Sequence, residues 1–365
     1  MNTRRFLTNW LEQIWYGSRP LERTLLLPLS KLFSFVSERR RKKLTEWQRP
    51  NRVPVIIVGN IAVGGTGKTP LTIRLAQLLR EQGYYPGIVS RGYGAKAVSK
   101  AAKTTDDAAT LIKPVSYQSL PEEVGDEALL LAARTGLPVV VGVDRPKVVD
   151  YLLDNHEVDI VLSDDGLQHY KLAREMEIVV VDGLRRFGNG YCLPAGPLRE
   201  KRERIEECDF VVCNTHSTSI EASSFNSNGR AQFGEYAMRL SGNWLVSLSN
   251  KRVTRPLSEL DNKTVHVVTA IGNPQRFLKQ LTKAGLHCRE HLYPDHYLFS
   301  GDEFSFSDEL PILMTEKDAV KCQQFSAEQL ENCWYLPVDA RLDTEFEQAF
   351  LQRVTEITAE LKRSE

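Results

Sequence analysis

Short apolar runs alternate with amphipathic segments over most of the chain beyond residue 52. The runs are rich in Val and Ile, which is typical of strands that are buried on both faces. We expect such strands at 53–59, 87–90, 137–143, 158–163, 176–182 and 209–214. Helical spacing of apolar residues predicts helices at 70–82, 126–134 and 145–154. The alternation predicts an α/β fold in which helices cover both faces of a mostly parallel sheet.

A second, smaller α/β domain is expected towards the C-terminus. Residues 217–233 are rich in Ser, Asn and Gly and predict a surface connection. Further strands are expected at 235–240, from 265, at 310–314 and at 334–338, with helices at 275–284 and 344–362. We therefore expect N-terminal amphipathic helices over 1–50, a main domain over 51–234, a smaller domain with hinge strands over 235–343, and a C-terminal helix over 344–365 that returns to the main domain.

The N-terminal helices are both apolar and basic. Trp10, Leu11, Ile14 and Trp15 recur at about one helical turn, and the apolar segment 25–36 runs into five consecutive basic residues, Arg39 to Lys43. Residues 1–52 carry twelve Lys and Arg against four Asp and Glu, although the formal net charge of the whole chain is zero. A helix lying in a membrane interface combines these features, whereas a helical hairpin packed on the next domain is the alternative.

Length and composition exclude several other classes. At 365 residues the chain is long for one core, so two domains are the default expectation. The sequence contains no apolar run of about 18 residues, so a membrane-spanning helix is not expected. Asn9 and Glu12 interrupt the apolar stretch that a signal peptide would need. The six cysteines form no Cys-x-x-Cys pair, which favours reduced thiols and gives no sign of a cysteine metal site.

A phosphate-binding loop follows the first predicted strand, in the segment Ala62-Val-Gly-Gly-Thr-Gly-Lys-Thr69. Glycines let successive backbone N–H groups, together with the helix N-terminus, bind phosphate oxygens. The residues expected to hold a nucleoside triphosphate are Gly64, Gly65, Thr66, Gly67, Lys68 and Thr69. Lys68 would contact the β- and γ-phosphates, and the Thr69 hydroxyl would ligate Mg²⁺. The strict pattern begins with Gly, and Ala62 replaces it here. The fold class is therefore that of a P-loop NTPase.

Acidic residues stand where such a site would need them. The strand at 158–163 ends in Asp164 and Asp165, which are suited to holding Mg²⁺ directly or through water. Asp126 and Glu127 stand at the start of a predicted helix. There they can be acids of the first turn, favoured by the helix dipole, or a general base and a metal ligand. The residues alone leave both interpretations open.

Other polar residues indicate an anionic substrate. Arg91, Arg145 and Arg199 each stand beside a strand end, and the planar guanidinium group binds two phosphate oxygens at once. His296 lies in the loop Tyr293-Pro-Asp-His-Tyr297, where it is either a surface residue or one that orients a base.

Taken in order, the motifs closely resemble the tetraacyldisaccharide 4′-kinase (lipid A 4′-kinase) family over about residues 55–340. The segments that carry the resemblance include Gly-Asn-Ile-Ala-Val-Gly-Gly-Thr-Gly-Lys-Thr-Pro70, Ser-Arg-Gly-Tyr-Gly94, Val-Gly-Asp-Glu127, Ser-Asp-Asp-Gly-Leu-Gln-His169, Leu-Pro-Ala-Gly-Pro-Leu-Arg-Glu200, Thr-Ala-Ile-Gly-Asn-Pro274, Pro-Asp-His-Tyr297 and Thr-Glu-Lys-Asp-Ala319. The resemblance implies transfer of the γ-phosphoryl group of ATP, with Mg²⁺, to the 4′-hydroxyl of tetraacyldisaccharide 1-phosphate, which gives lipid IVA. It also implies a peripheral enzyme on the cytoplasmic face of the Gram-negative inner membrane.

The resemblance also implies residue roles. Asp126 would be the base, His296 would assist it, and Lys68 would act on the transferred phosphate. Because we place Asp126 and His296 in different domains, we expect domain closure during catalysis. Candidate metal residues are Thr69, Glu127, Asp164, Asp165 and Glu200. Candidate substrate residues are Arg91, Tyr93, Arg145, Gln168, His169 and Arg199.

Three other classes fit the sequence less well. A partitioning-type switch ATPase carries a signature Lys where this chain has Val63, and a GTPase would need an Asn-Lys-x-Asp motif for guanine that Thr315-Glu-Lys-Asp318 does not supply. The basic run Arg39 to Lys43 stands beside Leu and Phe rather than on a base-stacking platform, so no nucleic-acid partner is expected. The expected partners are the lipid substrate and the inner-membrane surface.

Overall fold

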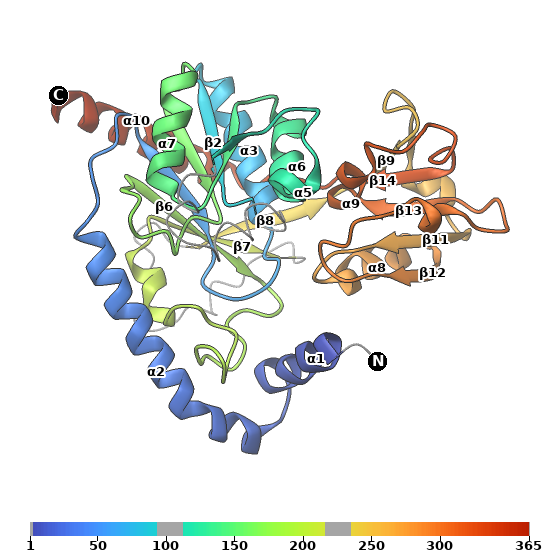
Figure 1. Cartoon of the computed structure of the whole chain (residues 1–365), viewed down its shortest axis with the longest axis horizontal. Coiled ribbons are helices and arrows are strands. Elements are labelled where there is room, and N and C mark those ends of the chain that lie inside the picture. The colour runs from blue at the N-terminus through green and yellow to red at the C-terminus, as the bar shows by residue number, and fades with distance from the viewer. Residues whose placement is uncertain (1–2, 93–111, 216–234, 365) are drawn as a thin grey trace. The chain divides into compact units, whose positions relative to one another are not determined.

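The computed structural model describes residues 3–92, 112–215 and 235–364 (Figure 1). Contacts divide the chain into two compact units. Unit 1 consists of Met1–Gly87, Asn155–Arg239 and Arg341–Glu365, and unit 2 of Ile88–Asp154 and Leu240–Ala340. Each unit is therefore assembled from separate stretches of chain.

This division differs from the domains expected from the sequence. Residues 88–154, which we placed in the main domain, group with residues 240–340. Asp126 and His296 consequently lie in one unit and not in two, as we had placed them, whereas domain closure during catalysis stays a prediction. The functional domain boundaries at 50, 234 and 343 stay a prediction.

Unit 1 is built on sheet strands in the order β15-β8-β7-β6-β1-β5. Its strands are β1 (Val55–Gly59), β5 (Ile160–Asp164), β6 (Met176–Asp182), β7 (Phe210–Asn214), β8 (Glu235–Ser241) and β15 (Asp339–Leu342). Its helices are α1 (Thr3–Tyr16), α2 (Pro20–Thr45), α3 (Lys68–Glu81), η2 (Arg202–Glu207) and α10 (Thr344–Ser364). The pairs from β8 through β5 are all parallel.

Burial explains why the apolar runs predict this sheet well. Every residue of β1 is buried, and β1 pairs with β5 so that Val58 lies opposite Asp164. The ring of Phe346 on α10 lies 5.4 Å from that of Phe210 on β7, so the C-terminal helix contributes to the core of unit 1. The parallel register places the C-terminal ends of β1 and β5 at the same edge of the sheet, where loops can form a binding site.

The long helix α2 lies on the outside of unit 1 (Figure 1). Contacts that join it to the rest of unit 1 include a hydrogen bond of 2.7 Å, which the buried Ser30 hydroxyl donates to the Cys192 carbonyl, and an ion pair between Glu38 and Lys201. Apolar side chains along another side of the helix are exposed: Leu21, Leu25, Leu29, Leu32, Phe35 and Val36. No helix within residues 3–92, 112–215 or 235–364 combines the length and apolar character needed to cross a bilayer.

Unit 2 contains a six-stranded sheet with the order β10-β9-β14-β13-β11-β12, together with a three-stranded group in the order β2-β4-β3. The strands are β2 (Pro86–Ser90), β3 (Lys113–Pro114), β4 (Val139–Val141), β9 (Trp244–Ser247), β10 (Thr254–Pro256), β11 (Thr264–Thr269), β12 (His287–Leu292), β13 (Ile312–Thr315) and β14 (Cys333–Leu336). The helices are α5 (Pro121–Val124), α6 (Asp126–Thr135), α7 (Arg145–Asn155), η4 (Leu257–Leu260), α8 (Pro274–Lys283), η5 (Asp302–Phe304), α9 (Glu316–Ala319) and η6 (Val320–Cys322).

Two hydrophobic clusters form the core around the six-stranded sheet. One joins Val265 and Val267 of β11 to Leu281 of α8, and the other joins Val268 to Met314 of β13. Successive residues of β11 thus supply both clusters, as expected for a central strand.

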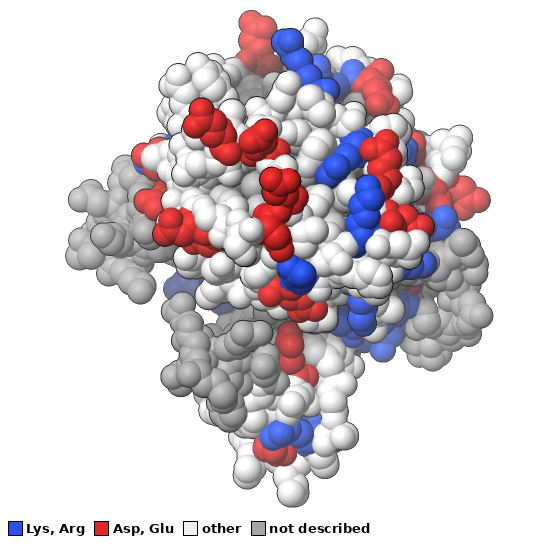
Figure 2. All heavy atoms as spheres, turned by 90° about the vertical axis from the view of Figure 1, so that its right-hand side faces the viewer, with Lys and Arg blue, Asp and Glu red and all other residues white. Residues whose placement is uncertain are grey.

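On the side of the molecule seen in Figure 2, acidic and basic side chains are intermixed.

Candidate functional site

The phosphate-binding loop connects β1 to α3 in unit 1. Gly64 and Gly67 have φ values of +117° and +98°, which side chains rarely permit. The Asn60 side-chain amide donates to the Ala62 carbonyl at 2.7 Å, and the buried Asn214 amide donates to the Thr66 carbonyl at 2.8 Å. Both amides therefore hold the backbone of the loop in place.

The loop is suited to an anionic group. Nothing lies within 4 Å of the position that a Cβ of Gly65 would occupy, so ligand atoms can approach this backbone. Helix α3 begins at Lys68, directly after the loop, and a helix N-terminus favours negative charge. Backbone shape and helix position therefore fit a phosphate chain.

Two carboxylates reach the same edge of the sheet from β5. Lys68 Nζ lies 3.4 Å from Asp165 Oδ1. Asp164 accepts hydrogen bonds from Thr72 Oγ1 at 3.1 Å and from Thr69 Oγ1 at 3.5 Å. Hydroxyl and carboxylate oxygens are the ligands that Mg²⁺ prefers, and this ion commonly takes only one or two carboxylates with phosphates and water. The oxygen donors present therefore fit Mg²⁺.

A polar group around Glu200 adjoins this loop. Gln168 Nε2 donates to Glu200 Oε1 at 2.6 Å and to the Asn60 carbonyl at 3.0 Å. Arg199 Nη1 donates to Gln168 Oε1 at 3.3 Å and lies 3.6 Å from Asp165 Oδ1. The structure thus brings Arg199, Gln168 and Glu200 together with the P-loop.

Unit 2 holds a second group of predicted site residues. Asp126 is the first residue of α6 and is 3% exposed. His296 Nδ1 lies 3.1 Å from Asp126 Oδ1 and 3.0 Å from Asp126 Oδ2, and its Nε2 lies 3.5 Å from Asp295 Oδ2. His296 has a φ of +59°, a strained backbone for a residue with a side chain. Such strain is common where a loop is held for a function.

The surroundings of Asp126 favour its carboxylate form. Burial by itself would raise the pKa of this carboxyl, but the hydrogen bond with His296 and the charges of Lys317 and Lys321 outweigh burial and lower the pKa. Burial would also lower the pKa of Lys317, yet Glu127, Asp126 and Asp295 raise it. A general base must be unprotonated to act, so these charges suit Asp126 to that role.

A family model described as tetraacyldisaccharide-1-P 4′-kinase matches residues 22–355. The chain belongs to this family. The tetraacyldisaccharide 4′-kinase of Methylobacillus flagellatus is 44% identical over 354 residues, which cover 96% of this chain and 97% of that protein. The enzyme of the same name from Shewanella denitrificans is 42% identical over 355 residues, covering 95% and 98%.

A solved structure gives the same result. LpxK from Aquifex aeolicus, crystallised in complex with ATP, has a TM-score of 0.73 and 28% sequence identity to this chain. The match covers 93% of this chain and 100% of that one. The family and the mostly parallel α/β fold of P-loop type, both predicted from the sequence, are therefore confirmed.

Not all predicted substrate residues of this 4′-kinase family member are accessible. Arg91 is exposed directly after β2, and His169 is half-buried beside the Glu200 group. Arg145, by contrast, is 1% exposed and donates from Nη1 to the Gly142 carbonyl at 3.3 Å, which is the environment of a structural residue. Tyr93 lies outside the described residues. The roles of these four residues stay predictions.

Lys317 lies in the quoted motif Thr-Glu-Lys-Asp-Ala319, and Lys321 lies two residues beyond this motif; the sequence does not reveal a role for either lysine. Lys317 Nζ donates to Glu127 Oε1 at 3.0 Å and lies 3.9 Å from Asp126 Oδ1. The buried Lys321 Nζ lies 3.7 Å from Asp126 Oδ2. In the sequence both lysines come shortly after a buried strand, as Asp165 does, and Lys317 is in addition part of a quoted motif.

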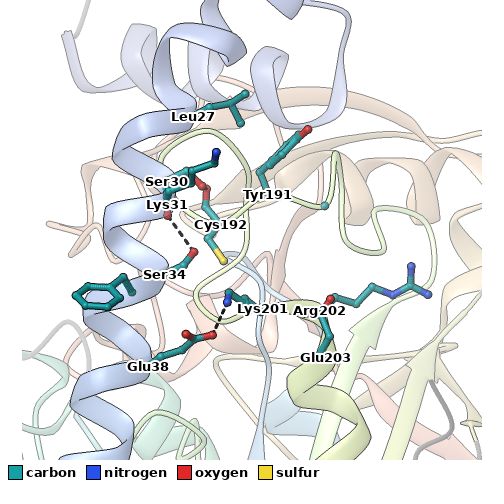
Figure 3. Close-up of a pocket in the computed structure, with 12 residues that line it drawn as sticks. Leu27, Ser30, Lys31, Ser34, Glu38, Tyr191, Cys192, Lys201, Arg202 and Glu203 are labelled. Carbon is teal, nitrogen blue, oxygen red and sulfur yellow. Dashed lines mark hydrogen bonds and ion pairs between the residues drawn. The ribbon is translucent and has the colours of Figure 1, made fainter. Parts of the chain in front are cut away.

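A pocket of about 460 Å³ lies between α2 and the segment 190–203 of unit 1 (Figure 3). Lys31 and Leu27 line it from the helix, Tyr191 lines it from the loop, and an ion pair of 2.6 Å joins Lys201 Nζ to Glu38 Oε1. None of the predicted site residues of this 4′-kinase family member lines the pocket. Its lining combines apolar side chains with both basic and acidic ones.

Proposed function

We propose that this chain is a lipid kinase that transfers the γ-phosphoryl group of ATP to the 4′-hydroxyl of tetraacyldisaccharide 1-phosphate, forming lipid IVA in lipid A biosynthesis. Family membership supports the proposal, and LpxK from Aquifex aeolicus binds ATP. The observation that carries it furthest is that one chain contains both a P-loop and a buried carboxylate, Asp126, which is hydrogen-bonded to His296. The first binds a nucleotide and the second suits proton removal from an alcohol.

In unit 1 the chain's part in the reaction is to hold phosphate and balance charge. Backbone N–H groups at Gly64–Gly67 bind the phosphate chain, and Lys68 supplies a positive charge to the β- and γ-phosphates. Thr69 and Asp164 would hold Mg²⁺, with Asp165 and Glu200 close to its water shell. When bound, Mg²⁺ neutralises the charge that develops on the phosphate oxygens.

In unit 2 the chain's part is to take up a proton. Asp126 accepts the proton of the sugar hydroxyl, and the hydrogen bond from His296 keeps its carboxylate oriented. Phosphoryl transfer has a loose transition state, so positioning and electrostatics supply most of the acceleration. The proposal requires both sets of residues to act on one pair of reactants.

The test is transfer of γ-³²P from ATP to purified tetraacyldisaccharide 1-phosphate in detergent micelles, followed by separation of the labelled lipid. We expect label on the lipid only when enzyme, lipid and Mg²⁺ are all present. A disaccharide that already carries a 4′-phosphate is the matched control and should accept no label. Hydrolysis of ATP without labelled lipid would instead indicate a partner-binding switch ATPase.

We further propose that α2 places the enzyme on the cytoplasmic face of the inner membrane. Leu21 and Leu25 are each 79% exposed, Leu29 is 54% exposed and Leu32 is 59% exposed, and these four positions recur every three or four residues. Arg39 and Lys43 continue the same side of the helix towards its C-terminus. An apolar stripe that leads into cations fits anionic lipid headgroups over an acyl-chain layer.

Charging this stripe should release the protein from membranes. Each leucine transferred to the interface contributes about 1.5–3 kcal/mol, so Leu25→Glu/Leu32→Glu should lower binding to vesicles at least about tenfold. Co-sedimentation with vesicles of anionic phospholipid measures this. The matched control is Leu184→Glu, a leucine of unit 1 that is 74% exposed but lies outside α2. Equal binding by the α2 variant and the control would remove α2 from the membrane contact.

A further inference from the structure

The segment Thr315–Cys322 lies against the Asp126–His296 pair but has no part in the function proposed above. It follows β13 and forms the short helices α9 and η6. Three of its charged side chains face inward: Lys317, Asp318 and Lys321. Asp318 is 0% exposed and Lys321 is 2% exposed. Buried charges are costly unless they are paired, so their retention calls for an explanation.

Asp318 is held by a full set of donors. Its carboxylate accepts hydrogen bonds from the Thr269 hydroxyl at 2.7 Å and the Thr315 hydroxyl at 2.6 Å. The Ala270 backbone N–H donates to it at 3.2 Å, and Lys321 Nζ donates at 2.8 Å. A carboxylate has about four acceptor positions, so Asp318 is saturated and its position is fixed. Asp318 therefore acts as the anchor for Lys321.

From this anchor, Lys321 approaches Asp126 directly and is connected to the His296 loop through the Ala270 carbonyl. Its Nζ lies 3.7 Å from Asp126 Oδ2 and donates to the Ala270 carbonyl at 3.1 Å. The same carbonyl accepts the backbone N–H of His296 at 3.3 Å. One ammonium group thus adjoins the carboxylate of Asp126 and the backbone contact that holds the His296 loop, whose φ of +59° needs support.

We infer that Lys321 is a positioning residue for the Asp126–His296 pair, and that Asp318 holds it in place. The inference rests on the proposed kinase function. Lys321 is too buried to contact substrate, so it acts through Asp126 and the His296 loop. Lys317, whose side chain is 20% exposed, approaches the other oxygen of Asp126 and binds Glu127. The two lysines therefore flank the Asp126 carboxylate, one at each oxygen.

The alternative is that the Lys321–Asp318 pair only stabilises unit 2. The two roles differ in their kinetics. A stabilising residue changes the amount of folded enzyme, whereas a positioning residue changes the turnover of enzyme that is folded. Misplacing a reacting group by about 1 Å can cost on the order of 100-fold in rate, and loss of a supporting partner commonly costs about 10- to 100-fold.

The first variant is Lys321→Met, which removes the charge and keeps the length of the side chain. We expect kcat for lipid phosphorylation to fall about 10- to 100-fold. The KM for ATP should change less than about threefold, because ATP binds to residues of unit 1. Full-length folded protein is compared, with active-site concentration taken from ATP binding. A normal kcat, or a raised KM with normal kcat, would overturn the inference.

The decisive measurement combines this change with Asp126→Asn. If Lys321 acts through Asp126, Lys321→Met should lower the residual rate of Asp126→Asn by less than about twofold, because interacting residues are not additive. A loss as large as in the wild-type background would assign Lys321 a structural role only. The control is His266→Leu, which removes a buried polar side chain of β11 that hydrogen-bonds to His291 and Asp308. That variant should keep kcat within about twofold.

If Lys321→Met does not fold, Asp318→Asn provides the same test. The amide keeps the size of the anchor but weakens its bond to Lys321, so kcat should fall about 3- to 10-fold with the KM for ATP unchanged. An unchanged kcat would again overturn the inference. Wild-type enzyme that puts no label on the lipid would refute the kinase itself and this inference with it, whereas active wild type with fully active variants would refute the inference alone.

Discussion

Lys68→Ala is expected to lower kcat for lipid phosphorylation on the order of 10³-fold or more, equivalent to about 4 kcal/mol of barrier. The residue begins α3 at the end of the P-loop, and its ammonium lies 3.4 Å from Asp165. Charge moves onto the β–γ bridging oxygen as the bond breaks, so a fixed cation there stabilises the transition state more than bound ATP. The larger effect should therefore be on kcat, with a smaller loss of ATP affinity.

The measurement is the initial rate of γ-³²P transfer at saturating ATP, with ATP affinity determined separately by equilibrium binding. Lys68→Arg should also be strongly impaired, because a planar guanidinium does not replace a compact ammonium in a tight loop. Lys362→Ala, an exposed lysine of α10, is the matched control and should be fully active. Transfer that stays within tenfold of wild type would show that Lys68 does not act on the phosphates.

The candidate site residues of the P-loop could be predicted from the sequence, because short stretches of sequence determine this loop and the strand and helix beside it. Buried parallel strands end at one edge of a sheet, so Gly67, Lys68 and Asp164 had to converge once β1 and β5 were recognised as neighbours. The glycines fix the loop, and the helix that follows them begins within two residues of its expected start. Prediction and structure agree here because the apolar strand β1 and the glycine-rich loop are adjacent in the sequence.

The contact between Asp126 and His296 could not be predicted from local sequence patterns. Asp126 and His296 lie 170 residues apart and meet only because residues 88–154 group with residues 240–340. No periodicity in either stretch indicates that grouping. Lys321 was missed for a related reason: a buried lysine following an apolar strand resembles a surface residue until its partners, 3 and 51 residues away, are known.

The sequence analysis did not predict β12, because this edge strand is rich in polar residues. The strand β12 has the sequence His-Cys-Arg-Glu-His-Leu, with mostly exposed or half-buried side chains. Among the strands that the structure describes, β12 stands at the end of the six-stranded order and has β11 as its one neighbour. Edge strands tolerate charges that a central strand could not bury, and charged edges discourage pairing with other chains. Alternation of apolar and polar residues therefore does not identify an edge strand such as β12, whose side chains are little buried.

Asp126→Asn should lower kcat about 10²- to 10⁴-fold, the range typical for loss of a general base. The amide has nearly the same shape and can still accept from His296, so the change removes basicity rather than structure. His296→Asn should cost less, because the carboxylate remains although its orientation is weakened. Rates of lipid labelling at saturating ATP and lipid measure both effects, and Glu309→Gln, an exposed acid of unit 2, is the matched control.

The effects of Asp126→Asn and His296→Asn on kcat should not be additive. Once Asp126 can no longer take a proton, the hydrogen bond at 3.0 Å from His296 has nothing left to orient, so the double variant should be about as slow as Asp126→Asn alone. Full additivity would mean that His296 acts on the substrate independently of Asp126. An Asp126→Asn enzyme with wild-type turnover would show that Asp126 is not the base and that another group removes the proton of the sugar hydroxyl.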